Sequence, residues 1–470
     1  MSVAWAAALS FIALGVMGLL PSLALAGWRF VTVPLAPVTG AVLAAVAAGA
    51  FLLLGGGFVL WSIALSVLAG GGVIAFWWRW PLKRPRLDRS RGTTPERVIV
   101  GVGLIGTVVA AALSLRALAT PTAGFDTRAL WALRDGWLLH SHAQALLDFK
   151  LHMFVIGQSG YPPLVSAEGA LGWGLSGVHS IRVAVIIVAL VNTAALLCLS
   201  AGLLAAARSA ASACGARWRL VVLGAGSLSA IAIVPIAFGI QEPFITNGYA
   251  DPMWALCAAG ALLFGLQLEV RPEWQGVAGL LVVAAGMSKQ EGLFTAVCLI
   301  VLITIRRLAA ARARREQLVV LVAPVIELAA LSWWWLAIHL TGSRDVSSPL
   351  APTSTMGHRA RAVLHGFSPS LHVLILAGAI AVLGGLALRR PRRRAGLGND
   401  AWAWLGLAAG LSVVSLVLIT GQAPVVPWIA GSVHRVTQYP AIAGWLIIGV
   451  WGITAASGLE SEPADEERST

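Results

Sequence analysis

The amino-acid sequence predicts an all-α polytopic membrane protein with about 13 transmembrane helices. Of its 470 residues, 58% are hydrophobic and only 11% are charged, whereas soluble domains carry about 25% charged residues. Long apolar runs recur along the whole chain, and a helix that crosses a bilayer needs about 20 such residues. So few charged side chains cannot cover a water-facing surface. This excludes a soluble enzyme, a secreted disulfide scaffold and a disordered protein.

We expect transmembrane helices at the apolar runs 3–26, 35–54, 57–78, 98–118, 180–206, 220–240, 249–269, 275–288, 292–306, 316–340, 370–388, 401–420 and 436–456. The charged segment 289–291 interrupts one long apolar stretch, which predicts two short helices that meet at a polar turn. Residues 1–26 end in a signal-peptide-like Ala-Leu-Ala. However, no Lys or Arg precedes Arg29, so we interpret these residues as a span.

The basic residues predict the orientation. Most of the 33 Lys and Arg residues lie at 79–97, 306–315 and 389–394 or at helix ends on the same side. Because positively charged loops remain in the cytoplasm, we expect the N-terminus outside and the acidic, disordered tail 457–470 inside. A wealth of Ala, Gly and Arg beside few Lys is typical of a GC-rich bacterial genome. We therefore expect a multi-pass protein of the bacterial inner membrane.

The unusual polar residues fall on the other, predicted outer side. They include Asp126, Tyr161, Glu168, Asn247, Asp251, Lys289, Glu291, His434 and Arg435. Acidic residues near a bilayer are costly and tend to be functional. The sequence therefore predicts a site that faces the periplasm or the outside.

The first outer loop, 119–179, is the longest in the protein. Its apolar residues stand at helical spacings with Arg128 and Arg134 among them, which predicts amphipathic helices at the membrane interface. Asp126 precedes these helices, and Tyr161 opens a Tyr-Pro-Pro-Leu turn. The alternative is a surface lid in which Asp126 only caps a helix.

Three later segments, 247–252, 288–292 and 432–440, carry the other candidate residues, and each also has a purely structural interpretation. Asp251 followed by Pro is a good helix start. Lys289 and Glu291 are placed to pair with each other between two helices. Arg435, near the end of a span, has a side chain long enough to reach the interface.

Together these segments resemble the bacterial GT-C glycosyltransferases, polytopic enzymes related to protein O-mannosyltransferases and aminoarabinose transferases. The resemblance consists of the outer-loop Asp before a Trp-containing helix, Tyr-Pro-Pro-Leu, Asn-Gly-Tyr-Ala-Asp, Lys-Gln-Glu-Gly, and an Arg followed by Pro near the last span. It covers about 98–456, which we expect to be the catalytic module. In such families the loop normally follows the first span. Residues 1–97, about three helices and a basic loop, are therefore expected to be an extension with another role.

The resemblance implies transfer of a sugar, with inversion, from a polyprenyl-phosphate donor to a glycan, lipid or protein acceptor of the cell envelope. Asp126 would be the general base that takes the acceptor's proton. The residues expected to bind the donor phosphate are Lys289 and Arg435, with His434, Arg128 and Arg134 behind them. The residues expected to bind the sugar or the acceptor are Tyr161, Asn247, Asp251, Glu291, Gln438 and Trp131.

We expect no cofactor, no metal and no nucleic-acid partner. If a metal is present, Asp126 and Asp251 are the residues to hold Mg²⁺ or Mn²⁺, since no His or Cys cluster has zinc spacing. The competing function is a transporter or flippase of a lipid-linked or envelope precursor. A third hypothesis is a non-catalytic lipid-binding subunit of an envelope complex.

Overall fold

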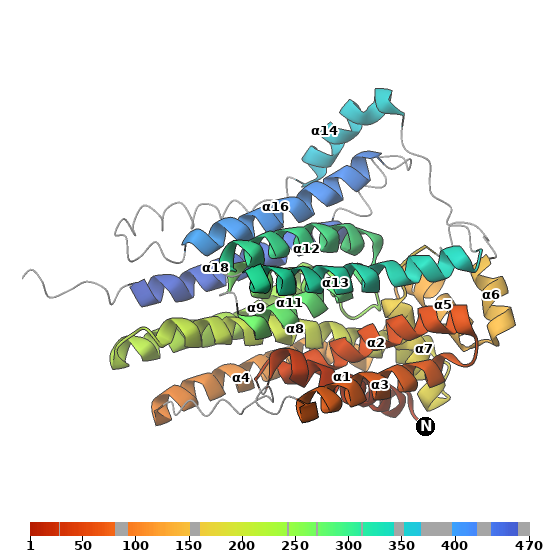
Figure 1. Ribbon diagram of the computed structural model, residues 1–470, viewed down its shortest axis with the longest axis horizontal. Coiled ribbons are helices and arrows are strands. Elements are labelled where there is room, and N and C mark those ends of the chain that lie inside the picture. The colour runs from red at the N-terminus through yellow and green to blue at the C-terminus, as the bar shows by residue number, and fades with distance from the viewer. Residues whose placement is uncertain are drawn as a thin grey trace, which may run out of the picture.

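The protein is a bundle of long helices that run side by side along one axis (Figure 1). A computed structural model describes residues 1–27, 29–79, 93–150, 160–241, 244–268, 271–311, 314–342, 352–367, 397–420 and 434–458. No β-strand occurs in these residues, and ten of their helices are long and apolar enough to cross a bilayer. The chain is therefore an all-α, membrane-embedded protein.

The ten helices are α1 (Val3–Ala26), α2 (Thr32–Leu54), α3 (Phe58–Arg79), α4 (Thr94–Ser114), α8 (Ile181–Ala211), α9 (Ala216–Gln241), α12 (Gln290–Ala310), α13 (Arg314–Leu340), α16 (Leu397–Thr420) and α18 (Gln438–Gly458). The shorter elements are η2 (Leu115–Ala119), η3 (Thr127–Trp131), α5 (Ala132–Leu139), α6 (His142–Lys150), α7 (Leu164–Ser176), α10 (Asp251–Leu262), η4 (Leu263–Gln267), α11 (Pro272–Ser288), η5 (Thr353–Thr355) and α14 (Met356–Phe367).

Two of the predicted spans form helices that are too short to belong to these ten. The run 249–269 is α10, with 12 residues, followed directly by the five-residue π-helix η4. The run 275–288 is α11, with 17 residues. The predicted span 370–388 lies outside the described residues. The number of about 13 spans stays a prediction.

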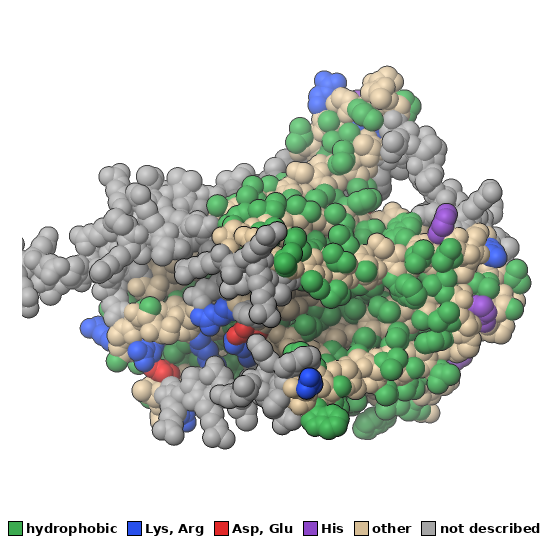
Figure 2. All heavy atoms as spheres, in the orientation of Figure 1, with side chains coloured by type: hydrophobic (Ala, Val, Ile, Leu, Met, Phe, Trp, Pro, Cys, Tyr) green, Lys and Arg blue, Asp and Glu red, His purple; other side chains and the backbone are tan. Residues whose placement is uncertain are grey.

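Most long helices that follow one another in the described part of the chain run in opposite directions, so many connections gather at two ends of the bundle. One end carries α5 and α6 (Figure 1), and we call it the α5–α6 end. At the opposite end, ion pairs join separate connections, such as Arg29 with Glu273 and Arg219 with Glu96. Figure 2 shows most of the visible Lys and Arg side chains toward this opposite end and a largely hydrophobic surface between. Basic side chains visible in this view are thus concentrated at one end of the bundle, with a few acidic side chains among them.

Helices α1 and α2 pack in very close contact. A Cβ atom added to Gly18 would lie 1.9 Å from the Ala36 carbonyl oxygen, and one added to Gly40 would lie 2.0 Å from the Leu14 carbonyl oxygen. Helix α2 also contacts α7, α8, α11 and α13. Helices α1 and α2 are therefore an integral part of the bundle.

The predicted helices of the first outer loop are present as α5 and α6, with α7 after them. The Nε2 atom of His142 lies 3.0 Å from the carbonyl oxygen of Leu52, near the end of α2. The ring of Phe149 meets Trp334 of α13 edge to face, with centroids 5.7 Å apart. These contacts fix the connection to the bundle. Their position at a membrane interface stays a prediction.

Candidate functional site

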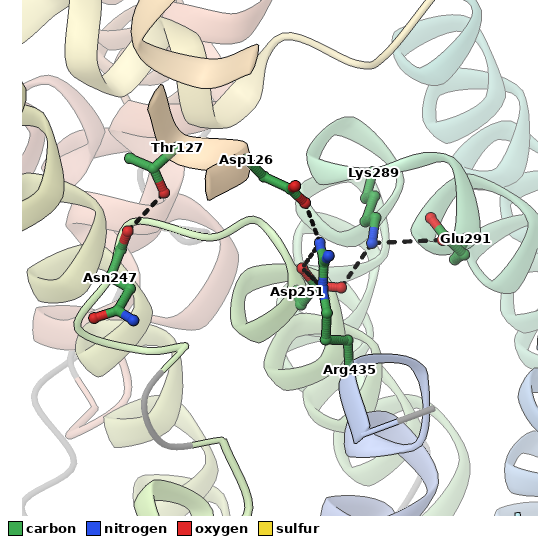
Figure 3. Close-up of polar contacts among 7 residues, drawn as sticks. All are labelled: Asp126, Thr127, Asn247, Asp251, Lys289, Glu291 and Arg435. Carbon is green, nitrogen blue, oxygen red and sulfur yellow. Dashed lines mark hydrogen bonds and ion pairs between the residues drawn. The ribbon is translucent and has the colours of Figure 1, made fainter. Parts of the chain in front are cut away.

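Five charged side chains from distant parts of the chain meet at the α5–α6 end (Figure 3). We call Asp126, Asp251, Lys289, Glu291 and Arg435 the ion network. Three helices begin here: α10 at Asp251, α12 directly after Lys289, and α18 three residues after Arg435. Asp126 immediately precedes the π-helix η3, and such single π turns are frequent at functional sites.

The fold of the 289–291 segment follows the sequence prediction. Helix α11 ends at Ser288, and Lys289 has extended backbone angles, φ −157° and ψ 161°. Helix α12 then begins, with Glu291 in its first turn. The extended residue turns the Lys289 side chain toward the network.

Asp251 is the centre of the network. Its Oδ1 accepts a hydrogen bond from Lys289 Nζ at 2.6 Å. Its Oδ2 accepts from Arg435 Nη2 at 2.8 Å and from Arg435 Nε at 3.1 Å. The same Nη2 donates to Asp126 Oδ2, and Glu291 Oε1 lies 3.5 Å from Lys289 Nζ. One arginine therefore joins the two aspartates.

Exposure decreases from one side of the network to the other. The side chains of Asp126 and Arg435 are 19% and 16% exposed, that of Lys289 is 7% exposed, and that of Asp251 is completely buried. A molecule that approaches the network from solvent therefore meets Asp126 and Arg435 first. The buried carboxylate of Asp251 binds Lys289 and Arg435 on the side away from solvent.

The carboxylates of the network stabilise the charged form of Lys289. Desolvation alone would lower the pKa of Lys289, but the carboxylates of Asp251 and Glu291 outweigh it and hold this pKa above its ordinary value. Lys289 is therefore a permanent cation. Desolvation, reinforced by the negative charge of Glu291, raises the pKa of Tyr161 to about 12, so this phenol stays protonated.

The segment before α10 holds the loop that carries Asp126. The carbonyl oxygen of Asn247 accepts from the backbone N–H of Gly124 at 3.1 Å and from Thr127 Oγ1 at 2.6 Å (Figure 3). The Asn247 Oδ1 accepts from Thr122 Oγ1 at 3.1 Å. We expected Asn247 to bind a sugar or acceptor. In the structure, both of its oxygens accept hydrogen bonds from the loop that carries Asp126.

Two other predicted residues form an aromatic cluster beside the network. The rings of Trp131 and Tyr161 meet edge to face with centroids 5.6 Å apart. Arg134, only 1% exposed, donates from Nη2 to the Tyr161 carbonyl oxygen at 2.7 Å. Its guanidinium also lies 5.5 Å from the Trp334 ring centroid. The position of Arg134 suits a residue that supports the Tyr161 turn rather than one that meets a phosphate from solvent.

The remaining predicted residues lie around the network without a described ion pair to it. Arg128 is exposed and donates from Nε to the Ala123 carbonyl oxygen at 3.1 Å. His434 is exposed beside Arg435. Gln438 is fully buried one turn after Arg435, and its side-chain atoms have no hydrogen-bond partner among the described residues.

Sequence reasoning missed Tyr249 and Asp135 at this end, although it had placed Glu168 on the predicted outer side. Tyr249 places its ring 4.7 Å below the Arg435 guanidinium; the aromatic in Asn-Gly-Tyr-Ala-Asp was the available signal. Asp135 and Glu168 are buried carboxyl groups. Burial raises the pKa of both well above the usual range, and Asp135 adds to the effect on Glu168. We find no sequence signal that would have paired them.

A metal ion between Asp126 and Asp251 would take the position of a side chain. The Arg435 guanidinium already lies between the two carboxylates and donates to Oδ2 of each. Within the described ranges, no three His, Cys, Asp or Glu side chains are grouped to hold a metal ion. The two aspartates are thus joined by a guanidinium in this arrangement.

Comparison with known proteins gives no match: no family model, no curated protein and no solved structure matches this chain.

Proposed function

We propose that this protein is a membrane glycosyltransferase that moves a sugar from a polyprenyl-phosphate donor to a cell-envelope acceptor. The observation that carries the proposal is the contact between Asp126 and Arg435. It puts a partly exposed carboxylate next to a permanent cation, at the end of a membrane-embedded bundle. Transfer of a sugar from a phosphate donor to a hydroxyl uses a base for the hydroxyl proton and a cation for the departing phosphate, and a lipid-borne donor suits a site at the end of membrane helices.

Asp126 is the general base of the proposed reaction. Its carboxylate takes the proton from the acceptor hydroxyl as that oxygen bonds to the anomeric carbon. The bond between the anomeric carbon and the phosphate oxygen breaks, and the polyprenyl phosphate leaves with its electron pair. Attack from the face opposite the leaving group inverts the anomeric centre, as the resemblance implies.

Arg435 is the cation for the departing phosphate. A guanidinium binds phosphate oxygens with two parallel hydrogen bonds, and Arg435 is the more exposed of the two network cations. The incoming phosphate competes with Asp126 for Nη2. Donor binding thereby frees the carboxylate that the reaction needs as a base, while Asp251 keeps its hold on the arginine.

The proposed orientation places the α5–α6 end outside the cytoplasmic membrane of a bacterium. Its support is the separation of basic residues to the opposite end, which the positive-inside rule assigns to the cytoplasm. No nucleotide sugar is available outside the cell, and a donor carried by a lipid reaches the site through the bilayer. The acceptor is then a glycan, lipid or protein of the envelope.

One observation favours a transporter or flippase as the second candidate. Transporters bind their substrates at interrupted helices whose amino ends point to the site, and α11 and α12 are interrupted at Lys289. The two functions differ in product, because a transporter leaves the sugar–phosphate bond intact.

The test is sugar transfer by purified protein in lipid nanodiscs. A panel of polyprenyl-phosphate sugars is offered with extracted envelope lipid and glycan as acceptor, and the products are identified by mass spectrometry. We expect turnover by wild type and a loss of at least about 10²-fold in Asp126→Asn.

The control is Asp148→Asn, which changes a carboxylate of the same end that pairs with His140, outside the ion network. It should keep wild-type turnover. Equal turnover by wild type and folded Asp126→Asn would remove Asp126 as the base. Intact donor recovered from every wild-type reaction would contradict the transferase and favour the transporter.

A further inference from the structure

Tyr249 lies between the two groups that the proposed reaction uses. On one side its ring touches the Asp126 loop so closely that a Cβ atom on Gly124 would stand 1.9 Å from Tyr249 Cε2. On the other side the Arg435 guanidinium carbon lies 4.7 Å from the ring centroid. Phe244 supports the ring edge to face, with centroids 5.2 Å apart.

The residues just before Tyr249 reinforce its hold on the loop. The Asn247 carbonyl oxygen binds Gly124 and Thr127 as described above. Gly248 has φ +77°, a left-handed backbone that favours glycine. A Cβ atom here would also stand 2.7 Å from Thr127 Cγ2. The segment 247–249 is therefore shaped to receive the Asp126 loop at close range.

A tyrosine ring in this position acts on a cation by electrostatics as well as by contact. The face of an aromatic ring attracts a guanidinium, and the attraction grows as water is removed from the pair. Arg435 is mostly buried, so its orientation depends on its carboxylate partners and on this ring. When Asp126 gives up its hydrogen bond to Arg435, the ring and Asp251 are the described contacts that remain.

We propose that Tyr249 is a positioning residue that fixes the Asp126 loop and the Arg435 guanidinium relative to each other. This inference rests on the proposed function for its consequence in catalysis. It explains why one aromatic side chain contacts both a glycine of the base-bearing loop and the cation. It assigns Tyr249 no direct contact with the substrate.

The experiment compares Tyr249→Phe, which keeps the ring, with Tyr249→Leu, which removes the aromatic face. The first measurement is amide hydrogen exchange of segment 122–128 in nanodiscs, which needs no ligand. The second is the dissociation constant of farnesyl phosphate, a short polyprenyl phosphate, which needs no turnover. Sugar transfer is measured separately on the same samples.

We expect Tyr249→Leu to speed exchange in this segment and to weaken farnesyl phosphate binding roughly 2- to 30-fold, the range for a cation–π contact. Tyr249→Phe should leave both the exchange rate of the segment and the dissociation constant of farnesyl phosphate near the wild-type values. As a single change, Gly124→Ala should weaken farnesyl phosphate binding, because its Cβ atom displaces the Tyr249 ring. In the Tyr249→Leu background it should weaken binding little further, because that ring is absent. Gly136→Ala, which meets no atom within 4 Å, is the control.

The inference is overturned if Tyr249→Leu exchanges and binds as wild type does, or if Tyr249→Phe behaves like Tyr249→Leu. It is also overturned if wild type does not bind farnesyl phosphate, because Arg435 then has no phosphate to receive. If wild type binds farnesyl phosphate and the variants behave as expected, but no sugar is transferred, the proposed function fails while the positioning role stands.

Discussion

Replacement of Lys289 by Met tests whether the ion network holds the α5–α6 end together. Lys289 Nζ lies 2.6 Å from the fully buried Asp251, and at an effective dielectric constant of about 20 two unit charges at this distance attract by about 6 kcal/mol. Arg435 stays hydrogen-bonded to Asp251 after the change, so part of the electrostatic stabilisation of Asp251 is kept. We therefore expect a loss of about 3 kcal/mol in the free energy of unfolding, the lower end for breaking a buried pair.

The assay is reversible unfolding in mixed micelles at increasing denaturing-detergent content, followed by circular dichroism. Glu291→Gln is the comparison, because Glu291 lies farther from Lys289, at 3.5 Å, and is 14% exposed. Glu291→Gln should lower the free energy of unfolding by clearly less than Lys289→Met does, because Lys289 keeps its shorter contact with Asp251. The Lys289→Met and Asp251→Asn pair should also be strongly non-additive. Equal costs for Lys289→Met and Glu291→Gln, with additive effects in the pair, would refute this account.

Three further predictions concern protonation and packing. Burial raises the pKa of Glu168, so the folded chain keeps a proton that the unfolded chain releases above about pH 4. The free energy of unfolding should fall as pH rises, and Glu168→Gln should flatten this slope in thermal melts. Arg359→Met removes the donor to two carbonyls at the end of α16 and should speed amide exchange in α14; a wild-type rate would contradict this role. Gly40→Ala should cost about 1–3 kcal/mol through overpacking, whereas Gly15→Ala, with no atom within 4 Å, should be nearly neutral; equal unfolding midpoints would contradict the packing argument.

Much of the fold was predictable because the membrane restricts the choices. Apolar length alone identified the ten long helices, since a backbone in lipid must satisfy its own hydrogen bonds. The interruption at Lys289 was predictable for the same reason, because a charged segment inside an apolar run is costly to bury without partners. The lengths of α10 and α11 were not predictable, because burial among other helices and burial in lipid leave the same hydrophobic pattern.

The members of the ion network were predictable, but their partners were not. Charged residues at one predicted face identified Asp126, Asp251, Lys289 and Arg435 as candidates. Sequence reasoning paired Lys289 with Glu291, its neighbour in the chain. That pair is present at 3.5 Å, but the structure brings Lys289 closer to Asp251, 38 residues away. Such choices depend on tertiary geometry, as does the placement of the Tyr249 ring.

The meeting of three helix starts at the ion network gives the site a second source of positive potential. The amino end of a helix carries about half a positive charge from its aligned peptide dipoles, and α10, α12 and α18 each begin here. The five side chains include three carboxylates and two cations, so one negative charge is in excess. The backbone of the three helix ends offsets that excess. In the proposed reaction, this backbone potential favours the approach of an anionic donor while both basic side chains are still occupied, and so favours the exchange of Arg435 from carboxylate to phosphate.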